Sequence, residues 1–314
     1  MIIIRLMGGL GNQLFQYAFG KQISSLNNVE LKLDTTTGFK GDYYGRSYCL
    51  DQFSINAKFA TQEEICKFLG PSRSTGNIYK NRIMLKLKRI ITNDKLISLY
   101  QSARNIYSKR SKIVYETKAE YDPQIVENKY KEAYFKGYWQ SEKYFAGVSD
   151  PLRKDYRIIR ETPENAKAAQ EEILKSNSCG IHLRRYQNVP FKGLDKAAIK
   201  IYEELGMDYY SRALEIMRSK LGNIQLFVFS DDINWAKEKI GPWQKTSFVQ
   251  TGVDILDFRL FSLCKHQVIA NSTYSWWAAW LNSNKNKVVI APSRWFRHRY
   301  VDHGSLYPSS WNVI

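Results

Sequence analysis

Short apolar runs alternate with helical patterns through the second half of the chain. The apolar runs predict buried strands at residues 179–183, 224–229, 246–249, 267–270 and 287–291. The segments between them predict helices at residues 208–221, 233–240, 255–264 and 273–281. Strands that alternate with helices at this spacing are typical of right-handed βαβ crossovers. The pattern therefore predicts a Rossmann-like α/β domain with a parallel sheet.

The first half begins with a single βαβ unit. It consists of a strand over residues 2–6, a glycine-rich turn over residues 8–11, a helix from Asn12 and a strand over residues 29–34. Farther along, Thr61 and Glu64 have the spacing of a capping box, which predicts a helix through residue 69.

A helix signal near residue 160 separates the two halves. Thr162 and Pro163 have the order of an N-cap and a first-turn proline, and a helical segment follows them. We therefore expect two domains, residues 1–160 and residues 161–314.

Composition excludes the disordered and fibrous classes, because 44% of the 314 residues are hydrophobic and 25% are charged. The formal net charge of +17 predicts an anionic partner: a phosphate group, a nucleic acid or an acidic membrane surface. Residues 80–112 hold ten basic side chains and one acidic side chain. One apolar face in this segment fits a helix on a membrane surface, and fits an ordinary solvated helix equally well.

The four cysteines and four histidines are scattered along the chain without ligand spacing, so we expect neither a disulfide framework nor a structural zinc site. The apolar stretch at the start is too short for a signal peptide, and the longest uncharged stretch is too polar to span a membrane. We therefore expect a cytoplasmic protein whose membrane contact, where it occurs, is peripheral.

The glycine turn after the first strand has two interpretations. In a dinucleotide fingerprint, Asp34 would bind a ribose, but the third glycine would fall at position 14, which is Leu14. The turn is followed instead by Asn12 and Gln13, whose amides suit a polar ligand. A tight turn that lets the helix pack on the sheet is the structural alternative.

Charged side chains follow two of the predicted strands. His182, Arg184 and Arg185 end one strand, and ligands of open α/β sheets bind beyond the carboxyl ends of strands. Two guanidinium groups there suit a pyrophosphate, although arginines paired with surface carboxylates are the alternative. Asp231 and Asp232 end another strand, where they fit recognition of a nucleobase or ribose without a metal; helix capping by one of them is the alternative.

A polar turn precedes the last predicted helix. Asn271, Ser272 and Thr273 lie at its N-terminus, where backbone N–H groups and the helix dipole attract phosphate. We expect Trp277 and Trp280, farther along the helix, to belong to the core rather than to a stacking platform.

Four motifs in this order resemble the bacterial α-1,2-fucosyltransferases of glycosyltransferase family 11, over nearly the whole chain. They are GGLGNQLFQYA from Gly8, HLRR from His182, FSDD from Phe229 and NSTYSWWAAWL from Asn271. The resemblance implies a GT-B-like fold of two Rossmann-like domains facing a cleft. It also implies GDP-fucose as the donor, inversion at the fucose anomeric carbon, and no metal or other cofactor.

The resemblance also assigns roles to residues. His182 would contact guanine and Arg184 the β-phosphate, with Arg185 supporting the loop or the cleft. Asp231 and Asp232 would recognise guanine or ribose, and residues 271–275, Ser275 included, would hold the phosphates. The other domain would approach the sugar or acceptor through Gly9, Gly11, Asn12 and Gln13. Arg184 and Asn12 are the expected catalytic residues.

One departure from the family pattern affects the general base. Family members often continue the double arginine with Gly-Asp-Tyr, whereas Arg185 is followed here by Tyr-Gln-Asn at residues 186–188. A role for that aspartate cannot be transferred to this chain. Asp34 and Asp195 are the candidates that remain, and the spacing demands neither.

The sequence thus predicts an inverting enzyme that moves L-fucose from GDP-fucose to the 2-hydroxyl of a galactoside in cell-surface glycan or O-antigen synthesis. The acceptor would be a galactose-terminated oligosaccharide or a lipid-linked glycan, with residues 80–112 on an anionic inner membrane face and no nucleic acid bound. A nicotinamide-dependent oxidoreductase, a nucleic-acid-binding protein and a noncatalytic sugar-nucleotide-binding protein are the alternatives.

Overall fold

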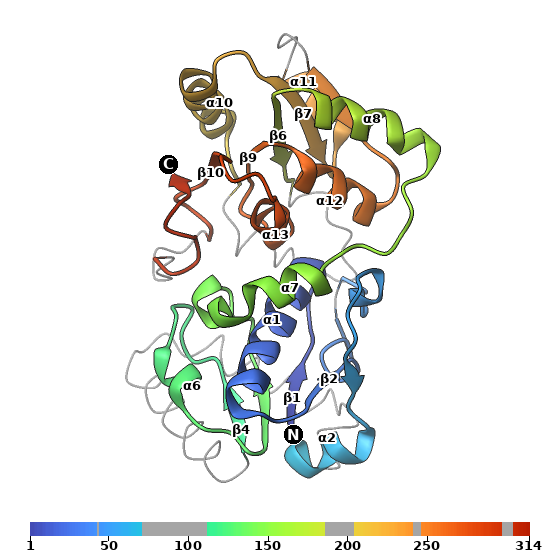
Figure 1. The fold of residues 1–314 in the computed structure, drawn as a ribbon, viewed down its shortest axis with the longest axis vertical. Helices are drawn as coiled ribbons and strands as arrows, with labels where there is room; N and C mark the ends of the chain where they lie inside the picture. The colour runs from blue at the N-terminus through green and yellow to red at the C-terminus, as the bar shows by residue number, and fades with distance from the viewer. Residues whose placement is uncertain (43, 71–111, 186–203, 241–245, 297–303) are drawn as a thin grey trace. The chain divides into compact units, whose positions relative to one another are not determined.

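The computed structural model describes residues 1–42, 44–70, 112–185, 204–240, 246–296 and 304–314 (Figure 1). It divides the chain into two compact units. Unit 1 comprises Met1–Leu50 and Ile55–Leu152, and unit 2 comprises Asp51–Ser54 and Arg153–Ile314. The expected basic segment lies outside the described residues apart from Lys112, and so does Asp195.

Unit 1 is built on a parallel sheet with the strand order β3-β2-β1-β5-β4. The strands are β1 (Ile2–Arg5), β2 (Leu31–Asp34), β3 (Lys58–Phe59), β4 (Ile113–Tyr115) and β5 (Ala133–Lys136). Ile2, Ile3 and Ile4 of β1 are fully buried, because helices cover both faces of a parallel sheet. Helix α1 (Leu10–Asn27) packs closely on the Ile4 face through Gly20, while α2 (Gln62–Leu69) packs on the Ile3 face.

Shorter elements complete unit 1. They are 3-10 turns at Glu142–Tyr144 and Ala146–Val148 and helix α6 (Pro123–Glu127). The 3-10 turn at Leu50–Gln52 and helix α7 (Ser149–Asp155) each run across a division between the units.

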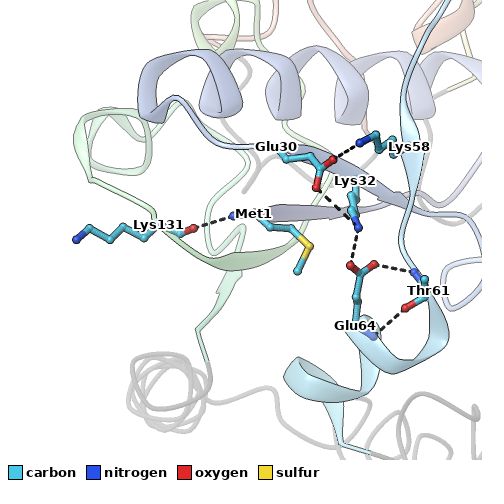
Figure 2. Close-up of polar contacts among 7 residues, drawn as sticks. All are labelled: Met1, Glu30, Lys32, Lys58, Thr61, Glu64 and Lys131. Atoms are coloured by element: carbon cyan, nitrogen blue, oxygen red, sulfur yellow. Dashed lines mark hydrogen bonds and ion pairs between the residues drawn. The ribbon is translucent and has the colours of Figure 1, made fainter.

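The predicted capping box at the start of α2 is confirmed (Figure 2). The Glu64 backbone N–H donates to the Thr61 hydroxyl at 3.2 Å, and the Thr61 N–H donates to the Glu64 carboxylate at 2.9 Å. Glu64 also pairs with Lys32 at 2.5 Å, while Glu30 pairs with Lys58 at 2.7 Å. The first ion pair joins α2 to β2, and the second joins β3 to the residue that precedes β2 (Figure 2).

Unit 2 is built on a second parallel sheet with the order β11-β10-β9-β6-β7-β8. The strands are β6 (Ser178–Leu183), β7 (Gln225–Ser230), β8 (Thr246–Val249), β9 (His266–Val268), β10 (Val289–Ala291) and β11 (Asn312–Val313). The helices are α8 (Glu164–Lys175), α10 (Met207–Leu221), α11 (Ile233–Ile240), α12 (Asp254–Leu263) and α13 (Thr273–Leu281). The α/β class with two Rossmann-like domains is therefore confirmed.

Alternation along β6 sorts its side chains between two layers. Ile181 and Leu183 join a core with α10 and α11 on one face of the sheet. His182 points to the other face, where its ring lies 5.9 Å from that of Phe261 on α12. This register decides which side chains at the end of β6 lie beside α12 and α13.

Two expected helix starts are shifted in the structure. Helix α1 begins at Leu10 with Gly9 as its N-cap, two residues before the expected Asn12. Pro163 is the N-cap of α8 rather than its first helical residue. Thr162, the expected cap, instead accepts a hydrogen bond from Arg259 of α12 at 2.6 Å.

The short segment Asp51–Ser54 belongs to unit 2, although the residues before and after it in the sequence belong to unit 1. Phe53 is buried, forms an antiparallel bridge with Ile158, and lies 6.2 Å from the ring of Phe258 on α12. The Ser54 N–H donates to the Arg157 carbonyl at 2.8 Å. Unit 2 is therefore discontinuous in the sequence.

Candidate functional site

The predicted donor-binding residues gather at one place in the sheet of unit 2. From β6 the chain proceeds to β7 and β8 on one side, whereas β9, β10 and β11 lie on the other side. The strand order therefore reverses between β6 and β9, and ligands of open α/β sheets bind at such a point, outside the carboxyl ends of the strands. His182 to Arg185 come from the end of β6, and Asn271 to Thr273 follow β9.

His182 is buried at this point with an unused hydrogen-bonding atom. Its ring lies 5.5 Å from the ring of Tyr274 on α13. Burial, reinforced by the positive charge of Arg184, lowers the pKa of His182 to about 3, so the ring is neutral near pH 7. Among the described residues its Nδ1 atom is one of the few buried polar atoms that have no hydrogen-bond partner. Such an atom is costly unless a ligand or water satisfies it.

The two arginines are paired with the two aspartates of the next strand. Arg184 lies 3.1 Å from the Asp231 carboxylate, and Arg185 lies 3.2 Å from the Asp232 carboxylate. The Arg185 N–H also donates to Asp231 at 2.9 Å. Burial raises the pKa of Asp231 and outweighs the opposing effect of Arg184. The four charged groups therefore form one cluster across the ends of β6 and β7.

Asp232 also serves the local fold. Its carboxylate accepts the Trp235 N–H at 3.1 Å in the first turn of α11, as the capping alternative predicted. The Arg185 guanidinium lies 4.9 Å from the Trp235 ring, within cation–π range. Arg185 is thus held from two directions beside the cluster.

The N-terminus of α13 follows β9, the strand on the other side of the reversal point from β6 and β7. Ser272 is its N-cap residue, and no side chain caps the helix. Ser272 and Thr273 are half-buried, whereas Asn271 and Ser275 are buried and donate to carbonyl groups of Trp295 and Ala270. This arrangement suits Ser272 and Thr273 to ligand contact, and Asn271 and Ser275 to support of the turn.

Unit 1 has a reversal point of its own, between β1 and β5. Asn12, on the first turn of α1, is half-buried there and accepts a hydrogen bond from the Gln140 side chain at 2.9 Å. Gln13 is fully buried, and its amide bonds to Gly8, Ser47 and Cys49. We therefore assign Gln13 to support of the loops and keep Asn12 as the residue available to a ligand.

Glycines shape the turn that precedes Asn12. Gly8 has a φ of +78°, and a Cβ atom there would lie 2.5 Å from Asn12 Nδ2. Gly9 caps α1 and Gly11 is buried in its first turn. Their contribution here is therefore backbone shape, beside the amide of Asn12.

Asp34 is a structural carboxylate rather than a general base or a ribose ligand. It is fully buried and accepts hydrogen bonds from Thr36 and Thr37 and, at 2.6 Å, from the Tyr134 hydroxyl. Desolvation alone would raise its pKa, but these donors lower it overall. A buried carboxylate stabilised in its charged form cannot readily accept a proton.

The tryptophans of α13 belong to the core, as the sequence analysis predicted for Trp277 and Trp280. Trp276 and Trp277 are fully buried and Trp280 nearly so. Within the described part of the chain, no three His, Cys, Asp or Glu side chains are grouped as metal ligands would be. None of the described helices is long and apolar enough to cross a membrane.

Two parallel-sheet units with polar groups gathered at each strand reversal are typical of enzymes that act on nucleotide-linked substrates. The family model of glycosyl transferase family 11 matches residues 1–314, and this chain belongs to that family. It is therefore a glycosyltransferase, as the four motifs predicted.

Curated relatives agree with this membership. The chain is 31% identical to an α-1,2-colitosyltransferase from Escherichia coli over 316 residues, covering 99% of this chain and 98% of that protein. It is 36% identical to the O-antigen biosynthesis glycosyltransferase WbnK from Escherichia coli over 124 residues, covering 38% of this chain and 40% of that protein. A solved structure of NodZ α-1,6-fucosyltransferase co-crystallised with GDP aligns at 12% identity and a TM-score of 0.49, covering 88% of this chain and 91% of that chain.

Gln140, which the sequence analysis did not single out, lies beside the candidate residue Asn12. It lies 128 positions from Asn12, and only the pairing of β1 with β5 brings the two together. A search for polar residues just after each strand would have found it.

Proposed function

We propose that this glycosyltransferase moves L-fucose from GDP-fucose to the 2-hydroxyl of a terminal galactose, with inversion and without a metal or other cofactor. One observation carries the proposal. At the strand reversal of unit 2, a neutral His182 with an unused Nδ1 atom feels the charge of Arg184 and lies 5.5 Å from the ring of Tyr274, in the first turn of α13, whose N-terminus has no side-chain cap. This combination suits a ligand with a heterocyclic base and phosphates.

In the proposed reaction, the acceptor hydroxyl attacks the fucose anomeric carbon as the bond to GDP breaks. The diphosphate gains negative charge as it leaves, and preplaced donors at that point are usually the largest source of catalysis. Arg184, Ser272, Thr273 and the first amides of α13 would supply these donors. His182 would bind the guanine through a hydrogen bond from its unused Nδ1 atom, and its neutral ring suits that contact.

The aspartates have a different proposed role from the one that the resemblance implied. Asp231 and Asp232 already contact Arg184 and Arg185, so they would orient the guanidinium groups toward the diphosphate. An arginine offers five N–H donors in a planar fork, and one carboxylate contact leaves the fork able to bind an anion as well. Contact of either aspartate with guanine or ribose would add to this role.

Asn12 would act on the sugar or acceptor from unit 1. Its amide does not titrate, so it can orient a hydroxyl group but cannot accept the proton. With Asp34 committed to its structural bonds, Asp195 is the named candidate base that remains.

Colitose is a second candidate for the transferred sugar. The relative that matches this chain over nearly its whole length is named an α-1,2-colitosyltransferase. Colitose differs from L-fucose by the absence of one hydroxyl group. A site that hydrogen-bonds this hydroxyl would strongly reject the deoxy sugar, so a direct comparison of the two donors discriminates well.

The deciding experiment measures transfer from labelled GDP-fucose, and from the matching colitose donor, to a panel of galactosides with a chelator present. Linkage analysis of the product is expected to find fucose on the 2-hydroxyl. GDP-fucose binding without turnover would support the noncatalytic alternative. Binding of nicotinamide nucleotides, or salt-dependent binding of random DNA without affinity for GDP, would support the other two.

For the cellular setting, we propose a cytoplasmic enzyme that acts on a galactose-terminated oligosaccharide or lipid-linked glycan in cell-surface glycan synthesis. The WbnK relative, named for O-antigen biosynthesis, supports this setting. The basic segment 80–112 would contact an anionic membrane. Neutralising its lysines should weaken binding to anionic vesicles and leave transfer to a soluble galactoside unchanged; unchanged vesicle binding would defeat the membrane role.

A further inference from the structure

The turn that follows β5 contains a strained residue. Trp139 has a φ of +57°, in the left-handed region that bulky side chains rarely adopt, and its side chain is fully buried. Strained backbone of this kind persists only where its surroundings determine it, and it is concentrated at functional sites. The turn lies at the strand reversal of unit 1, where a ligand site is expected.

Glu116, just after β4, holds the turn in place. Its carboxylate accepts the backbone N–H groups of Tyr138 and Trp139, each at 2.7 Å. The Trp139 ring stacks on Phe19 of α1, with the ring centroids 4.1 Å apart. The turn is therefore fixed from the neighbouring strand and from the helix above it.

The residue that this turn presents is Gln140. Its Nε2 atom donates to Asn12 Oδ1 at 2.9 Å. On the opposite side, Asn12 Nδ2 packs against Gly8, where a Cβ atom would lie 2.5 Å away. The Asn12 amide is thus clamped in one orientation between the loops that follow β1 and β5.

We propose that Gln140 is a positioning residue of the transfer reaction. It fixes the Asn12 amide in the orientation that receives a hydroxyl group of the sugar or acceptor, and Glu116 places Gln140 through the strained turn. The inference rests on the proposed role of Asn12. A group that must hold a reacting hydroxyl within a fraction of an ångström needs such support.

A double-mutant cycle on the whole chain tests the proposal. Asn12→Ala and Gln140→Ala should each lower kcat by about 10- to 100-fold, the range that misplacement of a reacting group produces. Because Gln140 acts through Asn12, the double variant should lose no more than Asn12→Ala alone. Losses that multiply would overturn the proposal, and so would a Gln140→Ala variant with the kcat of the wild type.

Glu116→Gln tests the support of the turn. It keeps the size of the side chain but opposes one backbone N–H with an amide NH2 group, so kcat should fall. In the Gln140→Ala background it should cause no further fall. The matched controls are Gln62→Ala and Glu63→Gln on the exposed start of α2, which should leave kcat unchanged.

Two further readouts separate this inference from the proposed function. The affinity for GDP should be the same in all five single and double variants, because the proposed donor site belongs to unit 2. Thermal unfolding of each variant, compared with the wild type, shows whether unit 1 still folds. The cycle is measured with the sugar nucleotide that the wild-type chain turns over. A donor other than GDP-fucose would therefore defeat the proposed function and leave the cycle intact.

Discussion

At the end of β6, the neutral side chain of His182 lies two residues before the charged side chain of Arg184. Burial keeps His182 uncharged beside the positively charged guanidinium group of Arg184. The pair can therefore bind a heterocyclic base and an anion at adjacent positions without competing for a proton. The carboxylate of Asp231 offsets the cost of removing the half-buried Arg184 guanidinium from water.

Replacing Arg184 should affect turnover much more than folding. Arg184→Ala removes a donor from the leaving diphosphate, and loss of one such donor typically lowers kcat by about 10²- to 10³-fold. Steady-state transfer kinetics and thermal unfolding of the variant measure the two effects. Arg212→Ala on the exposed side of α10 is the control. Near-normal turnover of Arg184→Ala would contradict the assignment.

His182 should make the stability of unit 2 depend on pH. Its pKa is about 3 in the folded state against 6.5 for an ordinary histidine, so the unfolded chain binds the proton first as the pH falls. The stability that neutral His182 contributes is complete above pH 6.5 and is lost progressively toward pH 3. Between pH 6.5 and 5 the loss is about 2 kcal/mol.

Denaturant unfolding of wild type and His182→Gln at both pH values measures this difference. The unfolding free energy of the variant should depend less on pH, because the contribution of His182 is missing. His266 contributes equally in both proteins, so its effect cancels in the comparison. Equal slopes in the two proteins would show that His182 titrates normally.

At the scale of elements, buried amide side chains of α1 fix the loops that follow β1 and β5 in unit 1. Gln13 and Gln16 of α1 bond to the loops that follow β1 and β5. Gly8 allows the first of these loops to turn with a positive φ and lets Asn12 lie against it. The precision of the Asn12 position therefore depends on backbone shape as much as on its partner.

Gly8→Ala and Gly41→Ala separate the effect of backbone strain from the effect of contact with Asn12. Both glycines have a φ above +70°, so each alanine variant should lose about 1–2 kcal/mol of unfolding free energy. A Cβ atom at Gly8 also meets Asn12, whereas nothing lies within 4 Å of one at Gly41. Only Gly8→Ala should reduce kcat as well. Equal transfer rates in the two variants would contradict the role of Asn12.

The sequence predicted elements better than contacts. Periodicity located α11 and α13 at their observed bounds, because each is a distinct helical segment between buried strands. The motifs proposed to bind the donor were recognisable because each follows its own strand. The Asn12–Gln140 contact and the embedding of Asp34 were not, because both depend on which strands are neighbours in the sheet. Strand order is a tertiary property that local pattern does not encode.

At the scale of the whole molecule, the residues with proposed roles are divided between the two units. All the proposed donor contacts belong to unit 2, whereas Asn12 and Gln140 belong to unit 1. A ligand that binds only the native state of one unit stabilises that unit by mass action. The location of the GDP site can therefore be read from unfolding experiments without any assay of turnover.

GDP should raise the unfolding temperature of unit 2 selectively. At 100 times its Kd, the expected stabilisation is about 2.7 kcal/mol. Thr61→Ala identifies the unit 1 transition in calorimetry, because loss of this cap costs about 1 kcal/mol. A shift by GDP of the transition that Thr61→Ala lowers would contradict the placement of the donor site.

The segment Asp51–Ser54 constrains the design of chimaeras between this chain and its relatives. A chimaera cut only near residue 153 would combine one parent's residues 153–314 with the other parent's Phe53, which must still fit beside Phe258 and Tyr156. A fragment that starts at residue 153 would leave that apolar face uncovered. Exchanging unit 2 between two relatives therefore requires transplanting these four residues together with residues 153–314.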